Sequence, residues 1–206
     1  MSIKVASPAD SPNRLDIAIA GHTGNANLAK TGLTSADPKI RASAILALHN
    51  LKQLGPDDLA KALEDQDSTV RRRACELAAS YRSVPLSSAL HDSDPFVVET
   101  ALWALGERGD KTELVTICEI AKNHPESLIR EAAVASLGAI GDQRGLETVI
   151  RGLKDRPNVR RRAVVALAAF EGEEVDTALR AATKDRDWQT RQIAEDLLEI
   201  TEGLRD

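Results

Sequence analysis

The chain has 206 residues, of which 42% are hydrophobic and 29% charged, with a formal net charge of -5. These are the proportions of a soluble globular protein, so they exclude a collagen-like, mucin-like or wholly disordered chain. Aromatic residues make up only 2%, and a core built mainly from alanine and leucine predicts many close-packed helices.

The N-terminal residues are expected to be a flexible tail. Residues 1–12 carry spaced serines and prolines and lack the apolar run of a signal peptide. Residues 13–20 are an apolar stretch that ends before Gly21, and they predict a capping helix. We expect residues 13–206 to form a single repeat domain. The chain has no apolar run of membrane-spanning length, so a cytoplasmic protein with no membrane contact is predicted.

After this stretch, one helical pattern recurs along the chain, in windows 37–48, 67–78, 94–105, 126–137, 156–167 and 187–198. Each window has an anchor residue, and successive anchors are 27 to 32 residues apart: Ile40, Val70, Val97, Ile129, Val159 and Thr190. Four residues after each anchor stands an alanine: Ala44, Ala74, Ala101, Ala133, Ala163 and Ala194. The anchor and positions +4, +5 and +8 share one face of a helix, which is therefore predicted to be buried.

The helices of the pattern have recognisable ends. Aspartate or serine before the anchor is a typical N-cap, and proline suits the first turn. Glycines such as Gly109 and Gly141 follow two of the windows and predict helix ends. A shorter amphipathic segment, for example 146–153, separates one window from the next. Each repeat is thus expected to be two antiparallel helices, which must stack on their neighbours to bury their apolar faces.

The D-P-x-V-R-x-x-A-x-x-A-L windows and the L-G-x-x-G-D connectors resemble HEAT repeats. They are most similar to the bacterial class named after phycobilisome lyases. The resemblance covers residues 25–202 and implies an all-α fold, a right-handed superhelical α-solenoid of about six antiparallel helix pairs. The expected repeats are 25–54, 55–82, 83–109, 110–141, 142–171 and 172–202.

In this family an arginine after the anchor and an aspartate in the turn form a ladder of hydrogen bonds between repeats. The resemblance assigns the arginine position to Arg41, Arg71, Arg130, Arg160 and Arg191. It assigns the acidic position to Asp37, Asp67, Asp94 and Asp187, with Glu126 as an approximate match. Val98 replaces the arginine in the third repeat, where Pro85 also leaves the first helix short. We expect a break in the ladder there.

A partner-binding surface is predicted from the columns -1, +2 and +6 of the second helices, which should face the concave side. Phe96, Glu99 and Trp103 are spaced i, i+3 and i+7 and so share one face. Charged residues in the same columns frame them: Arg72, Glu131 and Arg161. This layout favours a protein or peptide partner. The alternative is that both aromatic residues fill the core of the short third repeat.

No catalytic, metal-binding or cofactor-binding pattern is found. The four histidines stand singly, and none precedes a glutamate, unlike the paired His-Glu iron sites of the related hydroxylases. Cys75 and Cys118 match no zinc or redox spacing and are expected to be buried thiols. We therefore expect a monomeric, non-catalytic scaffold that has no metal or cofactor.

Two other functions remain open. The runs Arg71–Arg73 and Arg160–Arg162 suggest nucleic-acid binding of the kind found in HEAT-like alkylpurine glycosylases. Glutamates in the same columns and the scarcity of aromatic residues argue against it. The third possibility is chromophore handling like that of a phycobilin lyase subunit, although no residue is diagnostic of that activity.

Overall fold

The computed structural model describes residues 12–203, and within this range it contains twelve α-helices and no strand. The predicted all-α fold is therefore confirmed. The chain divides into two compact units, with the boundary between Pro85 and Leu86. The predicted single domain over residues 13–206 stays a prediction. Residues 1–11 of the predicted tail lie outside the described residues.

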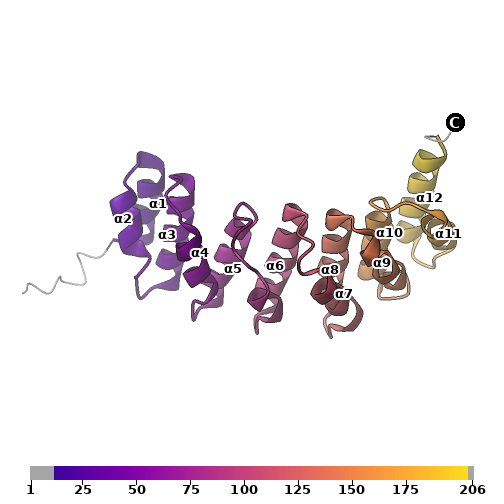
Figure 1. The fold of residues 1–206 in the computed structure, drawn as a ribbon, viewed down its shortest axis with the longest axis horizontal. Helices are drawn as coiled ribbons and strands as arrows, with labels where there is room; N and C mark the ends of the chain where they lie inside the picture. The colour runs from indigo at the N-terminus through magenta and orange to yellow at the C-terminus, as the bar shows by residue number, and fades with distance from the viewer. Residues whose placement is uncertain (1–11, 204–206) are drawn as a thin grey trace, which may run out of the picture. The chain divides into compact units, whose positions relative to one another are not determined.

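The first unit contains five helices, labelled in Figure 1: α1 (Arg14–Thr23), α2 (Ala26–Gly32), α3 (Pro38–Asn50), α4 (Pro56–Leu63) and α5 (Ser68–Ala78). Helix α1 covers the predicted capping segment and packs against α2 and α3. Its N-cap is Asn13, whose side chain accepts hydrogen bonds from the backbone N–H groups of Leu15 and Asp16. Helix α3 then packs against α5, which in turn packs against α4.

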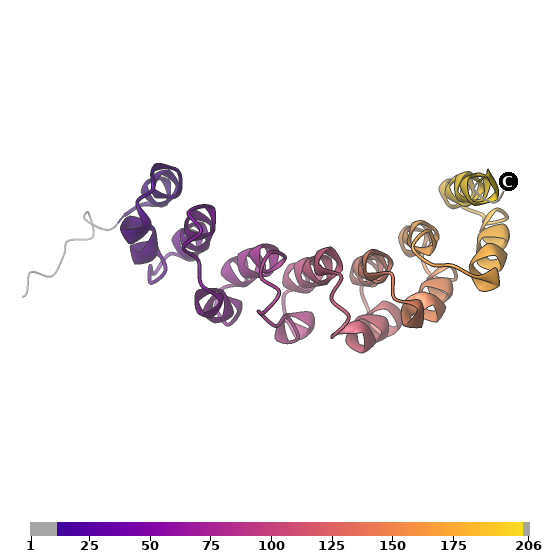
Figure 2. The same cartoon turned by 45° about the horizontal axis from the view of Figure 1, so that its top comes forward.

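The second unit has two rows of helices. One row consists of α6 (Pro95–Arg108), α8 (Ser127–Ile140), α10 (Pro157–Leu167) and α12 (Trp188–Gly203), each packed against the next. The other row consists of α7 (Leu114–Asn123), α9 (Leu146–Gly152) and α11 (Glu173–Ala182), and Figure 2 shows the two rows. Short 3-10 turns also occur: η2 (Ser88–His91) and η3 (Gln143–Gly145). Turn η2 takes the place of a full helix before α6, as Pro85 led us to expect.

The helix ends follow the local sequence signals. Asp37, Asp67 and Asp94 are the N-caps of α3, α5 and α6, and each accepts a hydrogen bond from the backbone N–H two residues ahead. Gly109 and Gly141 end α6 and α8 with φ angles of 59° and 62°. These are left-handed conformations that glycine adopts without steric cost.

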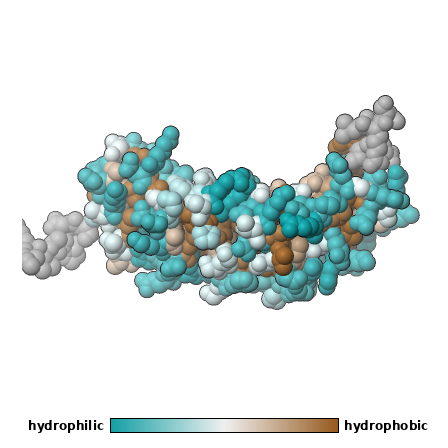
Figure 3. Space-filling view, in the orientation of Figure 1, coloured by the Kyte–Doolittle hydropathy of each residue, from teal (hydrophilic) through white to brown (hydrophobic). Residues whose placement is uncertain are grey.

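The core consists mainly of small and branched aliphatic side chains. The six alanines at position +4 are completely buried, each with 0% exposure: Ala44, Ala74, Ala101, Ala133, Ala163 and Ala194. Small side chains on the helix faces allow neighbouring helices to approach closely. The face shown in Figure 3 is mainly hydrophilic, with small hydrophobic areas between the helices. No helix in residues 12–203 is long and apolar enough to cross a membrane.

Candidate functional site

The arginines that follow the anchors connect successive interhelical turns. Nε and Nη2 of Arg130 donate to the two carboxylate oxygens of Asp155 at 2.7 and 2.6 Å. Its Nη1 donates to the carbonyl oxygen of His124 at 2.7 Å. One guanidinium thus holds the turn before its own helix and the turn of the next repeat.

The same geometry occurs in both units. In the first unit, Arg41 donates to both carboxylate oxygens of Asp65, at 2.8 and 2.6 Å. In the second unit, Arg160 donates to both carboxylate oxygens of Asp185 and to the carbonyl oxygen of Asp155. Arg71 and Arg191 donate to the carbonyl oxygens of Asp65 and Asp185. These side chains form what we call the arginine ladder.

The acidic partners differ from those expected. Asp37 and Asp67 cap helices, and each of these two caps lies on the helix side of its turn. The carboxylates that accept from the arginines are Asp65, Asp155 and Asp185, one or two residues before the cap. A sequence signal for them exists, because Asp-x-Asp recurs at 65–67, 92–94 and 185–187. The first aspartate faces the neighbouring repeat, and the second begins the helix.

Hydrogen bonding in the ladder favours the charged forms of both partners. The guanidinium of Arg41 holds the pKa of Asp65 below its usual value, against the opposing effect of burial. Arg130 lowers the pKa of Asp155 in the same way. The pKa values of these two arginines are correspondingly raised. In the third repeat, the ladder position is occupied by Val98, which is buried and brings no guanidinium.

The predicted aromatic residues lie on the surface of α6 and not in the core. Phe96 is 61% exposed and Trp103 is 48% exposed. Glu99 is also exposed, on the same helix face. The core alternative for these aromatics is therefore excluded. Of the other predicted surface residues, Glu131 lies on α8 and Arg161 on α10, while Arg72 is exposed on α5 of the first unit.

A cleft of about 400 Å³ lies between α6 and α8, and we call it the Trp103 cleft. Three predicted residues line it, namely Glu99, Trp103 and Glu131, whereas Phe96 and Arg161 do not. The other lining residues, which the sequence did not single out, are Gly106, Glu107, Leu128, Ala132, Ala135, Ser136, Ala139 and Arg162. A second hollow of about 330 Å³ shares Ala135, Ala139 and Arg162 with the cleft and extends it to Val165 on α10.

Ser136 is a polar residue in the wall of the Trp103 cleft. It is only 2% exposed, and its hydroxyl has no hydrogen-bond partner among the described residues. Its Oγ lies 3.5 Å from the point where a Cβ on Gly106 would stand. A buried hydroxyl without a partner costs about 1–3 kcal/mol. A ligand group that reached it would recover part of that free energy.

Charges at the rim of the cleft are partly paired. Glu131 accepts a hydrogen bond of 2.8 Å from Nδ2 of Asn158 and lies 3.6 Å from Nη2 of Arg162. Arg161 donates to Oε1 of Gln189. Within the run 160–162, the first arginine belongs to the ladder and the other two contact neighbouring polar side chains.

Comparison with known proteins decides the family. The family model described as HEAT repeats matches residues 56–132 and 114–199. The chain is a HEAT-repeat protein. Two similar solved structures are an engineered protein (20% identity, 94% of this chain and 85% of that chain covered, TM-score 0.44) and a designed armadillo repeat protein (18% identity, 92% and 87% covered, TM-score 0.43). No curated protein matches the sequence.

The described part of this HEAT-repeat protein offers no obvious metal centre. No group of three or more His, Cys, Asp or Glu side chains in residues 12–200 is arranged to hold a metal ion. Cys75 and Cys118 are free thiols and buried, as the pattern predicted. The HEAT-repeat assignment is confirmed, while bilin handling and nucleic-acid binding have no specific structural feature in their favour.

Proposed function

We propose that this HEAT-repeat protein is a non-catalytic scaffold that binds a protein or peptide partner at the Trp103 cleft. One observation carries the proposal: large, exposed apolar side chains stand beside a cleft whose wall contains an unpartnered hydroxyl. Trp103 is 48% exposed and Leu128 is 66% exposed, and Ser136 supplies the hydroxyl. Repeat folds of this kind present extended surfaces to partners and typically serve as scaffolds.

The composition of the cleft suits a polypeptide. Interfaces concentrate their binding free energy in a few central aromatic or apolar anchors that are ringed by polar residues. Here Trp103 and Leu128 are the anchors, and Glu99, Glu131 and Arg162 form the polar ring. The adjoining hollow toward Val165 lengthens the apolar surface across α10, so an extended segment or a helix of the partner would find contacts on three successive helices.

Affinity capture from the source cell with two matched variants tests this proposal. Trp103→Ala is expected to lose the partner, because truncation of a central anchor costs about 2 kcal/mol or more. Val115→Ala is the control, since Val115 is 75% exposed on α7 in the other helix row. It should capture the partner as the wild type does. Thermal unfolding should show only small changes for both variants, because neither side chain is in the core.

Ser136→Ala provides a second and independent measurement. Removing an unpartnered buried hydroxyl should leave stability unchanged or slightly higher, yet capture should weaken if a partner group bonds to this oxygen. Undiminished capture by Trp103→Ala would contradict the proposed site. Equal loss with Val115→Ala would show that capture depends on general surface hydrophobicity.

A further inference from the structure

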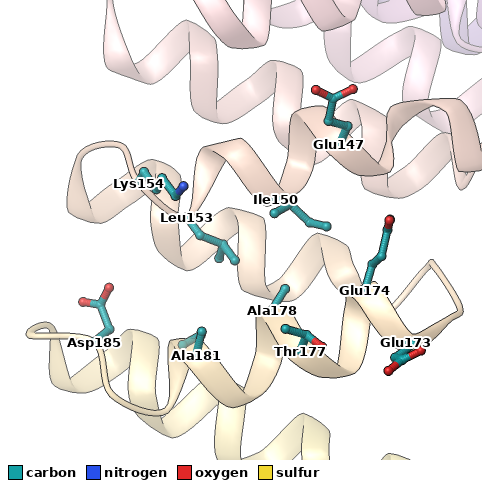
Figure 4. A pocket seen from close by; sticks show the side chains of 11 residues that line it. Glu147, Ile150, Leu153, Lys154, Glu173, Glu174, Thr177, Ala178, Ala181 and Asp185 are labelled. Atoms are coloured by element: carbon teal, nitrogen blue, oxygen red, sulfur yellow. The ribbon is translucent and has the colours of Figure 1, made fainter.

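A larger groove lies in the other helix row of the second unit, between α9 and α11. Its volume is about 880 Å³. Ile150 and Leu153 line it from the α9 side, and Ala178 and Ala181 line it from α11, as Figure 4 shows. Helix α9 packs against α7, α8 and α10, but no comparable packing joins α9 to α11. The row is therefore open at this point, and half-buried Ile150 and Leu153 remain accessible.

The two ends of the groove differ in charge. Glu147, Glu173 and Glu174 line the groove, and none of these carboxylates has a hydrogen bond or ion pair within the described residues. In Figure 4 they lie toward one end, whereas Lys154 and Asp185 lie at the other. Asp185 is already neutralised by Arg160. The groove thus combines an apolar floor with one strongly acidic end.

We propose that this groove is a docking site for a short amphipathic helix that carries lysine or arginine at one end. An apolar helix face would cover Ile150, Leu153 and the two alanines, which is the usual way in which a helix is recognised in a groove. The basic end would lie against the three unpaired glutamates, where opposite charges attract most strongly. A seat formed along α11, with 10 residues, is about 15 Å long and accepts roughly three helical turns.

This site is independent of the Trp103 cleft. The groove is formed by α9 and α11, whereas the Trp103 cleft is formed by α6 and α8 of the other row. The two sites share no lining residue. A scaffold with both sites would hold two polypeptides at once, and loss of one site should leave the other intact.

The test uses a synthetic peptide of about four helical turns, built from leucine, alanine and lysine, with the lysines concentrated in its last turn. It carries a fluorescent label, and binding to the full chain is followed by anisotropy. Saturable one-to-one binding with a Kd of about 10–100 μM is expected. A matched peptide with glutamate in place of lysine should not bind. Equal binding of both peptides would overturn the proposal, as would a complete absence of saturable binding.

Variants of the chain locate the peptide. Glu147→Gln combined with Glu174→Gln should weaken binding about tenfold and reduce its dependence on salt. Ala181→Arg, at an exposed position in the groove, should abolish binding by filling and repelling. The control combines Asp57→Asn with Glu64→Gln, which removes two exposed acidic charges from α4 and its C-terminal end in the first unit. It should leave affinity unchanged.

Three further results would overturn the proposal. The first is an equal loss of affinity in the control variant, which would indicate general attraction to an acidic protein. The second is loss of peptide binding in Trp103→Ala, which would place the peptide in the other cleft. The third is a dimer in sedimentation velocity that Ala181→Arg dissociates, because a second copy of the chain would then be the occupant.

Discussion

At the scale of single residues, the ladder arginines concentrate several interactions in one side chain. Arg160 is 4% exposed, and its guanidinium bonds the carboxylate of Asp185 and the carbonyl oxygen of Asp155. Bidentate, charge-assisted hydrogen bonds of this kind are geometrically specific and about twice as strong as neutral ones. Because these bonds satisfy carbonyl oxygens in turns that lack regular partners, each arginine also stabilises the local backbone.

Arg130→Ala should destabilise the protein by about 2–3 kcal/mol, because it removes charged hydrogen bonds and leaves Asp155 without its partner. Arg151→Ala is the matched control, since Arg151 is an exposed helical arginine of the same unit and has no ion pair among the described residues. Its replacement should change stability by no more than about 0.5 kcal/mol. Urea unfolding compares the two variants, and coincident midpoints would contradict the assigned role of the ladder.

The ladder also predicts a dependence of stability on pH. The pKa of Asp155 is lowered in the folded protein by Arg130, whereas an unfolded aspartate titrates near about 3.9. A group with a lowered folded pKa stabilises the protein above its unfolded pKa, and this contribution is lost as the pH falls through the folded pKa. Asp155→Asn should therefore unfold at lower urea concentration than wild type at neutral pH, and this difference should shrink below about pH 4.

Asp57→Asn is the control for that measurement. Asp57 is exposed in the first turn of α4 and has no ion pair among the described residues, so its replacement should shift the midpoint only slightly at either pH. A difference between wild type and Asp155→Asn that stays constant from neutral pH to about pH 3 would show that the carboxylate charge is not what stabilises the turn.

At the scale of helices, close approach between neighbours depends on glycine and alanine. Gly138 on α8 faces α10, and a Cβ added there would stand 2.8 Å from the Cβ of Ala166 and 3.0 Å from its Cα. Neither atom is the end of a flexible side chain, so the helices themselves would have to move. A glycine in the middle of a helix costs about 1 kcal/mol relative to alanine, and here the close contact explains why glycine is nevertheless suited to this position.

Gly138→Ala should lower stability by about 1–2 kcal/mol, because overpacking outweighs the gain in helix propensity. Gly106→Ala gives a graded comparison, since its added Cβ would stand 3.1 Å from the Cβ of Ala139 and 3.3 Å from the Cα of Ser136. It should cost less than Gly138→Ala. Thermal unfolding measures both variants, and a higher melting temperature for Gly138→Ala would contradict the proposed tight contact between α8 and α10.

At the scale of the whole molecule, charge bears on the possible partners. The net charge is -5, and most members of the two arginine runs bond polar groups of the protein itself. Arg73 pairs with Glu76 at 2.6 Å, and Arg162 lies 3.6 Å from Glu131. In the first run, Arg72 is the exposed member. A surface of this kind lacks the extended basic stripe that is typical of nucleic-acid-binding proteins.

We therefore expect no tight binding to nucleic acid. A gel shift with a DNA duplex should show at most weak retention at about 0.05 M salt and none at about 0.2 M, because association through a few phosphate contacts is lost by counterion competition. Retention that persists at the higher salt concentration would instead favour the nucleic-acid function considered from the arginine runs.

Much of the fold was determined by the sequence alone. The period of the anchors and the alanine four residues later predicted the second helices and their buried faces, and Ala133 and Ala163 are indeed fully buried. Such predictions succeed because helix periodicity and capping are local properties of the chain. The ladder arginines were also identified in this way, through a resemblance carried by a recurring motif.

Only the tertiary structure decided which groups meet between helices. It showed that Asp65, not Asp67, accepts from Arg41, and that Trp103 is exposed beside a cleft. It also revealed the unpartnered hydroxyl of Ser136. A repeat column gives the direction of a side chain from its own helix. The distance to the neighbouring helix depends on the volumes of both surfaces together, and therefore only the packed structure determines where a cleft or a groove remains open.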